Sequence, residues 1–247
     1  MLRKTCIYEK RFYRDWVRTG GLHLNRIIAK ESDLSVLSDK PLDLKFFEEK
    51  LRLYRWDIEE YIDKDRRFLS SLKPISVEIN APRIIKEMAL ASHKAGVGPM
   101  ACVAGAIADF LCRDLKKKGY KEIIIENGGD IVITTRKPRT IGIYPGKFSS
   151  WKSLKLKIKP KDTPLAICTS SGRIGHSLSF GSADIVTVLA SGGALADAAA
   201  TSIANLINSK DDLERAIKFA RSIKGVKGAL IIFRRNLASW GKIEFVA

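Results

Sequence analysis

The segment SGGALADAAATS (191–202) combines small residues with one carboxylate, Asp197, and one hydroxyl, Thr201. Residues four positions apart share one face of a helix, so the two side chains are expected to point the same way. Carboxylate and hydroxyl oxygens suit Mg²⁺, which takes few protein ligands beside water and phosphate. The alternative is an exposed acid near a helix start, with the Thr201 hydroxyl bonded back to its own helix.

A second polar segment, ENGGDI (126–131), places two glycines between apolar runs. Paired glycines allow a tight turn with positive φ and let a ligand approach the backbone closely. Asn-Gly is also a strong signal for a simple hairpin, in which Asp130 is a turn residue without chemistry. The residues that would contact a ligand here are Asn127, Gly128, Gly129 and Asp130.

A third segment, CTSSGRIGHSLSFG (168–181), follows an apolar run and is rich in hydroxyls and glycines. Hydroxyls and backbone amides in such a loop can hold phosphate oxygens, and Arg173 would add positive charge. The spacing is not that of a Walker loop, which needs Lys directly after its glycine. His176 is either an acid/base or ligand-contacting residue, or a plain loop histidine. The other candidate ligand contacts are Thr169, Ser170, Ser171 and Gly172.

Hydrophobic periodicity predicts hairpins mixed with helices along the chain. Strands are expected at 7–18 and 22–37, on both sides of the 127–130 turn, and in the runs that begin at residues 140, 154, 165, 184, 229 and 241. Helices are expected after Asp43 and over 82–96, 97–119, 191–208 and 212–223. No internal repeat stands out. This order favours an α+β fold, with a mostly antiparallel sheet packed against helices, over a doubly wound α/β fold.

The chain is strongly basic, with 44 Lys and Arg against 27 Asp and Glu and a net charge of +17. Such a charge raises nucleic acid as a partner. However, Lys155, Lys157 and Lys159 alternate with apolar residues, which is typical of a half-buried strand with lysines towards water. A polyanion-binding face and the steering of a phosphate-bearing small molecule stay open as alternatives. No helix-turn-helix or aromatic RNA platform supports nucleic-acid binding.

The composition, 247 residues of which 45% are hydrophobic, is enough for a sizeable core. No apolar run reaches the roughly 18–20 residues that span a bilayer, and early charges interrupt any signal peptide. We therefore expect a cytoplasmic protein without membrane association. The 4 cysteines and 3 histidines show neither a C-x-x-C pair nor zinc spacing, which indicates reduced thiols. The oligomeric state stays open, a homo-oligomer included.

Taken together, the motifs resemble the ApbE superfamily, best known as flavin transferases. The matching pieces, in order, are ENGGDI, IGIYPG, AICTSSG, His176 and VTVLASGGALADAAAT. The chain is similar over nearly its whole length to an uncharacterised ApbE-like family of archaea and anaerobic bacteria. That closer resemblance adds VGPMACVAG (97–105), GHSLSFG (175–181) and the N-terminal pair RFYR (11–14) and ESDL (31–34).

The resemblance implies a T-fold-like α+β architecture in a single domain, 1–247, with N-terminal strands and a long helix over 1–80 and the motif-bearing core over 81–247. It implies Mg²⁺ and a flavin ligand, FAD or FMN, and transfer of an FMN phosphoryl unit from FAD to Thr or Ser of a protein acceptor. Asp197 and Thr201 would be the Mg²⁺ ligands, and Asp197 and His176 the catalytic residues. The ENGGD and TSSG residues would lie against the nucleotide.

The sequence departs from the transferases in three places. We find no DGxFDP-type segment, GPMACVAG stands where the transferases carry a lysine, and GHSLSFG replaces a His-x-x-Asp-Pro-like run. An alternative function is therefore a scaffold in sulfur or homocysteine assimilation, with a persulfide on Cys168 or Cys102. A buried structural thiol is the simpler interpretation of each cysteine.

Overall fold

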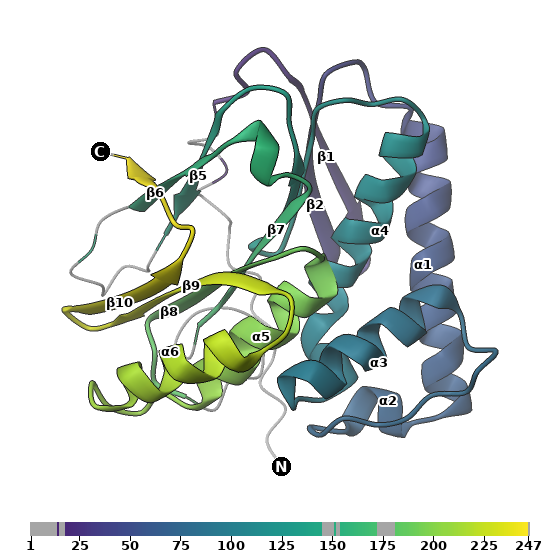
Figure 1. Cartoon of the computed structure of the whole chain (residues 1–247). Coiled ribbons are helices and arrows are strands. Elements are labelled where there is room, and N and C mark those ends of the chain that lie inside the picture. Colours follow the sequence, from purple (N-terminus) through teal and green to yellow (C-terminus); the bar gives the residue numbers. More distant parts are fainter. Residues whose placement is uncertain (1–13, 15–17, 145–150, 152–153, 172–180, 247) are drawn as a thin grey trace.

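The computed structural model describes residue 14 and residues 18–144, 151, 154–171 and 181–246. Its centre is an eight-stranded sheet, ordered β1-β2-β3-β4-β7-β8-β9-β10, in which all neighbours are antiparallel (Figure 1). Its strands are β1 (His23–Ala29), β2 (Ser32–Ser38), β3 (Ile123–Asn127), β4 (Asp130–Thr134), β7 (Leu165–Ser170), β8 (Ile185–Ala190), β9 (Val226–Phe233) and β10 (Asn236–Gly241). A smaller sheet, ordered β11-β6-β5, contains β5 (Arg139–Ile143), β6 (Leu154–Ile158) and β11 (Phe245–Val246).

Helices cover one face of the large sheet (Figure 1). They are α1 (Leu44–Lys64), α2 (Arg67–Ser70), α3 (Arg83–Ala95), α4 (Val103–Lys117), α5 (Gly193–Asn205) and α6 (Asp212–Ser222), with short 3₁₀ turns at Pro99–Cys102 and Pro160–Asp162. Helix α4 packs on β3 and β4, α5 on β7 and β8, and α6 on β9 and β10, while α1 and α3 contact α4. The small sheet packs against the opposite face of the large one. The protein therefore has three layers.

The side chains of strand β8 (Ile185–Ala190) alternate between the two faces of the large sheet. Val186, Val188 and Ala190 join the core beneath the helices. Ile185 and Leu189, on the other face, join the core beneath the small sheet. Because successive side chains of a strand point to opposite faces, a strand covered on both sides reads as a continuous apolar run.

Local signals explain where the helices begin and end. The Asp43 side chain accepts a hydrogen bond from the Phe46 N–H at 3.1 Å and caps the start of α1. Pro82 precedes α3, and Gly96 closes it in the left-handed conformation with φ of 74°. Both boundaries agree with the sequence prediction.

The structure corrects three expectations. The segment 22–37 is not one strand but the hairpin β1–β2, with Lys30 at a φ of 52° in its turn. Strand β10 was missed, and the helix predicted from residue 97 starts with the 3₁₀ turn. The lysine-bearing strand β6 is the middle strand of the small sheet. The strand predicted at 7–18 lies outside the described residues, apart from Arg14 and Arg18.

In the part of the chain that the structure describes, no single helix is long and apolar enough to cross a membrane. Only α3 and the Pro99–Lys117 segment taken together, across a bend of 101°, reach that length and composition.

Candidate functional site

Helices α4 and α5 meet through two glycines. A Cβ atom on Gly105 would lie 2.4 Å from the Gly193 carbonyl oxygen, and one on Gly193 would lie 2.0 Å from the Gly105 carbonyl oxygen. Distances this short exclude any side chain at either position. The small residues of the 191–202 segment thus allow close contact between two helices.

Each helix caps the first turn of the other with an aspartate. The Gly105 N–H of α4 donates to Asp197 Oδ2 of α5 at 2.9 Å, and the Gly193 N–H of α5 donates to Asp109 Oδ2 of α4 at 2.8 Å. A carboxylate at a helix N-terminus satisfies an unpaired N–H and favours the helix dipole. The two Asp residues therefore have equivalent structural roles.

This reciprocity is present in the sequence as a five-residue repeat, GAIAD (105–109) and GALAD (193–197). The expectation of no internal repeat was therefore wrong. Asp109 was missed as a partner of the site, although the matching G-A-x-A-D pattern was the signal that could have revealed it.

Helices α4 and α5 differ one turn after these aspartates. Arg113, four residues after Asp109, donates to Asp109 Oδ2 at 2.9 Å and to Glu87 at 2.8 Å. The equivalent residue after Asp197 is Thr201, which is buried. Among the described residues no Lys, Arg or His forms an ion pair with Asp197. One carboxylate is thus neutralised, and its twin is not.

A second buried carboxylate, Asp130, lies close to Asp197. Burial and then the negative charge of Asp197 raise the pKa of Asp130 well above its ordinary value, although the Thr169 N–H donates to it at 3.2 Å. Burial raises the pKa of Asp197 to about 7, against the lowering effect of the Gly105 and Ala104 N–H groups. Two interacting carboxyls in a dry site do not both ionise readily, so this pair retains protons near neutral pH.

The ENGGD segment forms the predicted tight turn between β3 and β4. Gly128 and Gly129 have φ of 69° and 103°, a conformation that favours glycine. A Cβ atom on Gly129 would meet nothing within 4 Å, so there is open space beside the turn. The Asn127 side chain donates to the Ala104 carbonyl at 3.1 Å and ties the turn to the start of α4.

At the end of β7, the side chains of Thr169 and Ser170 point to opposite faces of the large sheet. The Thr169 hydroxyl is hydrogen-bonded to Thr187 at 2.9 Å. Ser170, on the same face as Cys168, has a buried hydroxyl that finds no hydrogen-bond partner among the described residues. Ser171 follows the strand, and the predicted residues Gly172 and His176 lie outside the described residues.

The cysteine environments oppose persulfide chemistry. Cys168 and Cys102 are each fully buried. Burial, followed by the charges of Asp130 and Asp197, raises the pKa of both thiols well above the ordinary value. Because the thiolate is the reactive form, these surroundings favour inert, structural thiols.

The donor chemistry fits Mg²⁺ with few protein ligands. Among the described residues no group of three or more His, Cys, Asp or Glu could hold a metal ion. Asp197 and Thr201 offer hard oxygens, and Mg²⁺ usually completes its shell with water and phosphate. Asp130 is a further buried carboxyl beside Asp197, and a bound cation would favour its ionised form.

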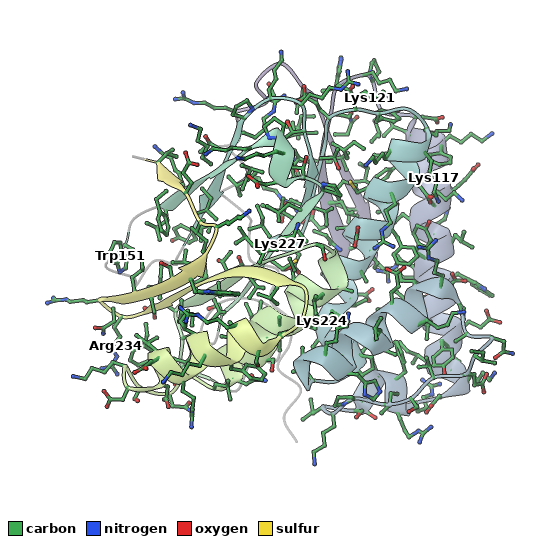
Figure 2. All side chains as sticks on the ribbon, viewed as in Figure 1. Lys117, Lys121, Trp151, Lys224, Lys227 and Arg234 are labelled. Atoms are coloured by element: carbon green, nitrogen blue, oxygen red, sulfur yellow. The ribbon has the colours of Figure 1, made fainter. Side chains whose placement is uncertain are left out.

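Two of the alternating lysines, Lys157 and Lys159, lie beside an acidic residue. Lys157 Nζ lies 3.5 Å from Glu244 Oε1, and Lys159 pairs with the same glutamate, which partly neutralises the lysines of β6. Figure 2 shows Lys117 and Arg234 on opposite sides of the molecule. This spread favours a solvated surface over a nucleic-acid-binding face.

Comparison with solved structures identifies the fold. The flavin transferase ApbE from Vibrio cholerae superposes with a TM-score of 0.60 at 14% identity, covering 89% of this chain and 97% of that one. The Pseudomonas stutzeri flavinyl transferase ApbE gives 0.60 at 12% identity, with coverages of 90% and 94%. The expected α+β, mostly antiparallel ApbE-like fold is confirmed.

Sequence comparison identifies the family to which the chain belongs. A family model described as "AbpE bacteria" matches residues 14–238, and the chain belongs to that family. A UPF0280 protein of Methanocaldococcus jannaschii is 41% identical over 223 residues, covering 88% of this chain and 90% of the relative. One from Methanosarcina acetivorans is 36% identical over 215 residues, with coverages of 87% and 85%. The predicted uncharacterised ApbE-like family is confirmed.

Proposed function

We propose that the chain binds a nucleotide-like ligand, FAD or FMN, against the ENGGD turn, the end of β7 and the Asp197 face of α5. The proposed reaction is Mg²⁺-dependent transfer of an FMN phosphoryl unit from FAD to a hydroxyl of a protein acceptor. A phosphoester bond to the acceptor oxygen forms, the pyrophosphate bond of FAD breaks, and AMP is released. The observation that carries the proposal is the buried Asp197 carboxylate, which forms no ion pair with any described residue, whereas Asp109, at the equivalent position, pairs with Arg113. The titles of the superposed structures, which name flavin transferases, support it.

In this proposal Asp197 and Thr201 hold Mg²⁺. The ion supplies neutralisation of charge on the phosphate oxygens, which is the main requirement of phosphoryl transfer. It also offsets the excess negative charge of Asp130 and Asp197. A ligand that requires ionised Asp197 competes with a proton, because the pKa of that carboxyl is about 7.

The remaining residues bind and orient the ligand. The open side of Gly129 lets a nucleotide approach the backbone, and the Ser170 hydroxyl offers it a hydrogen bond. In this proposal Asp197 also accepts the proton of the acceptor hydroxyl, a role that suits a carboxyl with a pKa of about 7. His176 is retained as the second proposed catalytic residue and Gly172 as a proposed ligand contact.

Isothermal titration of the full chain with FAD, FMN and ATP, with and without Mg²⁺, tests the proposal. We expect FAD or FMN to bind with a Kd well below about 1 mM when Mg²⁺ is present. The Mg²⁺-dependent part of the affinity should fall as the pH drops below 7, where a proton occupies Asp197.

The matched variants are Asp197→Asn and Asp109→Asn, which change equivalent residues of the repeat. Asp197→Asn should abolish the Mg²⁺ dependence, whereas Asp109→Asn should keep it. No binding of either flavin below about 1 mM by the wild type, or equal effects of the two variants, overturns the proposal.

A further inference from the structure

The N-terminal motifs RFYR and ESDL, which the proposed chemistry leaves unused, meet in the fold through Arg14 and Asp33. Arg14 is 6% exposed. Its Nη1 donates to Asp33 Oδ1 at 2.5 Å, and its Nη2 donates to the Asp33 carbonyl at 2.7 Å. Its Nε donates to Glu126 Oε2 at 2.6 Å. One buried guanidinium thus joins the N-terminal segment to two strands, β2 and β3.

Glu126 carries this connection into the ENGGD turn. While its Oε2 accepts from Arg14, its Oε1 accepts from the Gly129 N–H at 2.8 Å. Gly129 is the second glycine of the turn, with φ of 103°. The next residue is Asp130, the carboxyl that interacts with Asp197.

The turn is therefore held from both faces of the sheet. On the helix side, Asn127 donates to the Ala104 carbonyl at 3.1 Å. Glu126, the preceding residue of the strand, points to the opposite face, where it meets Arg14. Charge-assisted hydrogen bonds such as those of Arg14 are among the stronger ones in proteins, and the bidentate fork also fixes geometry.

We propose that Arg14 is a positioning residue that acts through Glu126 to fix the ENGGD turn, and with it Asp130. Without the guanidinium, Glu126 Oε2 loses the charge-assisted hydrogen bond that fixes the orientation of its side chain, and the carboxylate can rotate towards water. A rotation of the Glu126 side chain away from the turn releases the Gly129 N–H. The effect of Arg14 on ligand binding rests on the proposed function, whereas the effect of Arg14 on the turn does not.

Amide hydrogen exchange of Gly129 in the ligand-free full chain, measured by NMR, tests the inference. Arg14→Gln should reduce the protection of this amide by about tenfold to a hundredfold, the factor expected for loss of a charge-assisted hydrogen bond. Glu126→Ala, which removes the acceptor itself, should give a similar loss. Glu126→Gln, which keeps an acceptor oxygen, should retain much of the protection.

The matched control lies at the opposite end of β3, just before its first residue. Arg139 forms a comparable buried pair with Glu122, with Nη2 to Oε2 at 2.5 Å, before that strand begins. Arg139→Gln should lower the melting temperature and leave the protection of Gly129, relative to other β3 and β4 amides, unchanged. If Arg14→Gln lowers protection of all these amides equally, or leaves Gly129 protected, the inference is overturned.

The flavin titration of the same variants separates the two proposals. A wild type that binds no flavin, combined with selective loss of Gly129 protection in Arg14→Gln, defeats the proposed function and keeps the positioning role. If the wild type binds flavin, and Arg14→Gln changes neither the Kd nor the protection of the Gly129 amide, the proposed function is kept and the positioning role of Arg14 is overturned.

Discussion

Asp109 of α4 and Asp197 of α5 occupy equivalent positions near the start of their helices. The residue one helical turn later differs, and it gives the two carboxyls different chemistry. Arg113 keeps Asp109 in an ion pair that is partly exposed to water. Thr201, at the equivalent position, provides a hydroxyl and no charge. Buried carboxyls that have no cation beside them take up protons or bind cations, so the difference between Arg113 and Thr201 supports the proposed role of Asp197.

The stability of the protein should reveal this carboxyl pair. The folded pKa of Asp197, about 7, lies above the ordinary value of about 3.9 in an unfolded chain. The folded state therefore binds more protons in this range, and its free energy of unfolding falls as the pH rises from about 4 to about 7. Asp197→Asn removes the ionisation and should reduce that fall, by on the order of a few kcal/mol.

Urea unfolding at several pH values, without added divalent cation, measures the effect. The value belongs to the Asp130–Asp197 pair, because the two titrations are linked. If the free energy of unfolding changes with pH in the same way for the wild type and for Asp197→Asn, the assignment of a raised pKa to this pair is contradicted.

At the scale of the elements, the site depends on how closely α4 and α5 approach. Gly105 and Gly193 bring the two backbones together, so each Asp reaches the first turn of the other helix. The ENGGD turn joins this assembly through the contact of Asn127 with Ala104. Three separate segments, the starts of α4 and α5 and the ENGGD turn, thus meet around the start of α4.

Gly105→Ala should separate the helices and weaken the Asp197 cap. Its Cβ atom would lie 2.4 Å from a backbone oxygen and 2.8 Å from Asp197 Cβ, and neither neighbour is the end of a flexible side chain. We expect a loss of at least about 1–3 kcal/mol in the free energy of unfolding, the usual range for overpacking.

The control is Gly142→Ala on the exposed side of β5, where an added Cβ meets nothing within 4 Å. Its effect should stay within about 0.5 kcal/mol. Urea unfolding of both variants gives the comparison, and equal stabilities would show that the helices adjust freely.

At the scale of the whole molecule, the N-terminal part and the motif-bearing core share one sheet. β2, from the first 80 residues, pairs with β3 along Leu34–Ser38. The core beneath the helices contains residues of both parts, such as Leu34, Phe47 and Ile125. We therefore propose that residues 1–247 form a single domain.

A single domain predicts one cooperative unfolding transition. Thermal unfolding followed by far-UV circular dichroism and by tryptophan fluorescence should give coincident curves, and the calorimetric enthalpy should equal the van't Hoff enthalpy. Two resolved transitions would instead indicate that residues 1–80 fold separately.

Much of the fold could be predicted from local patterns. The amphipathic period of α1, the Asp43 cap and the glycine pair of the β3–β4 turn are each determined by neighbouring residues. The errors fell where local signals are weak. The β1–β2 turn places Lys30 and not glycine at positive φ, and β10 has only half-buried or exposed side chains.

The sequence by itself determined the helices, most of the strands, the family and the candidate residues, because periodicity, caps and motif order are local properties of the chain. The tertiary structure decided which acids share an environment. Asp130 and Asp197 are far apart in sequence and interact in a dry interior, while Asp109 meets Arg113 and Arg14 meets Glu126. Burial and electrostatic interaction depend on distances in space, and these distances set the chemistry of each carboxyl.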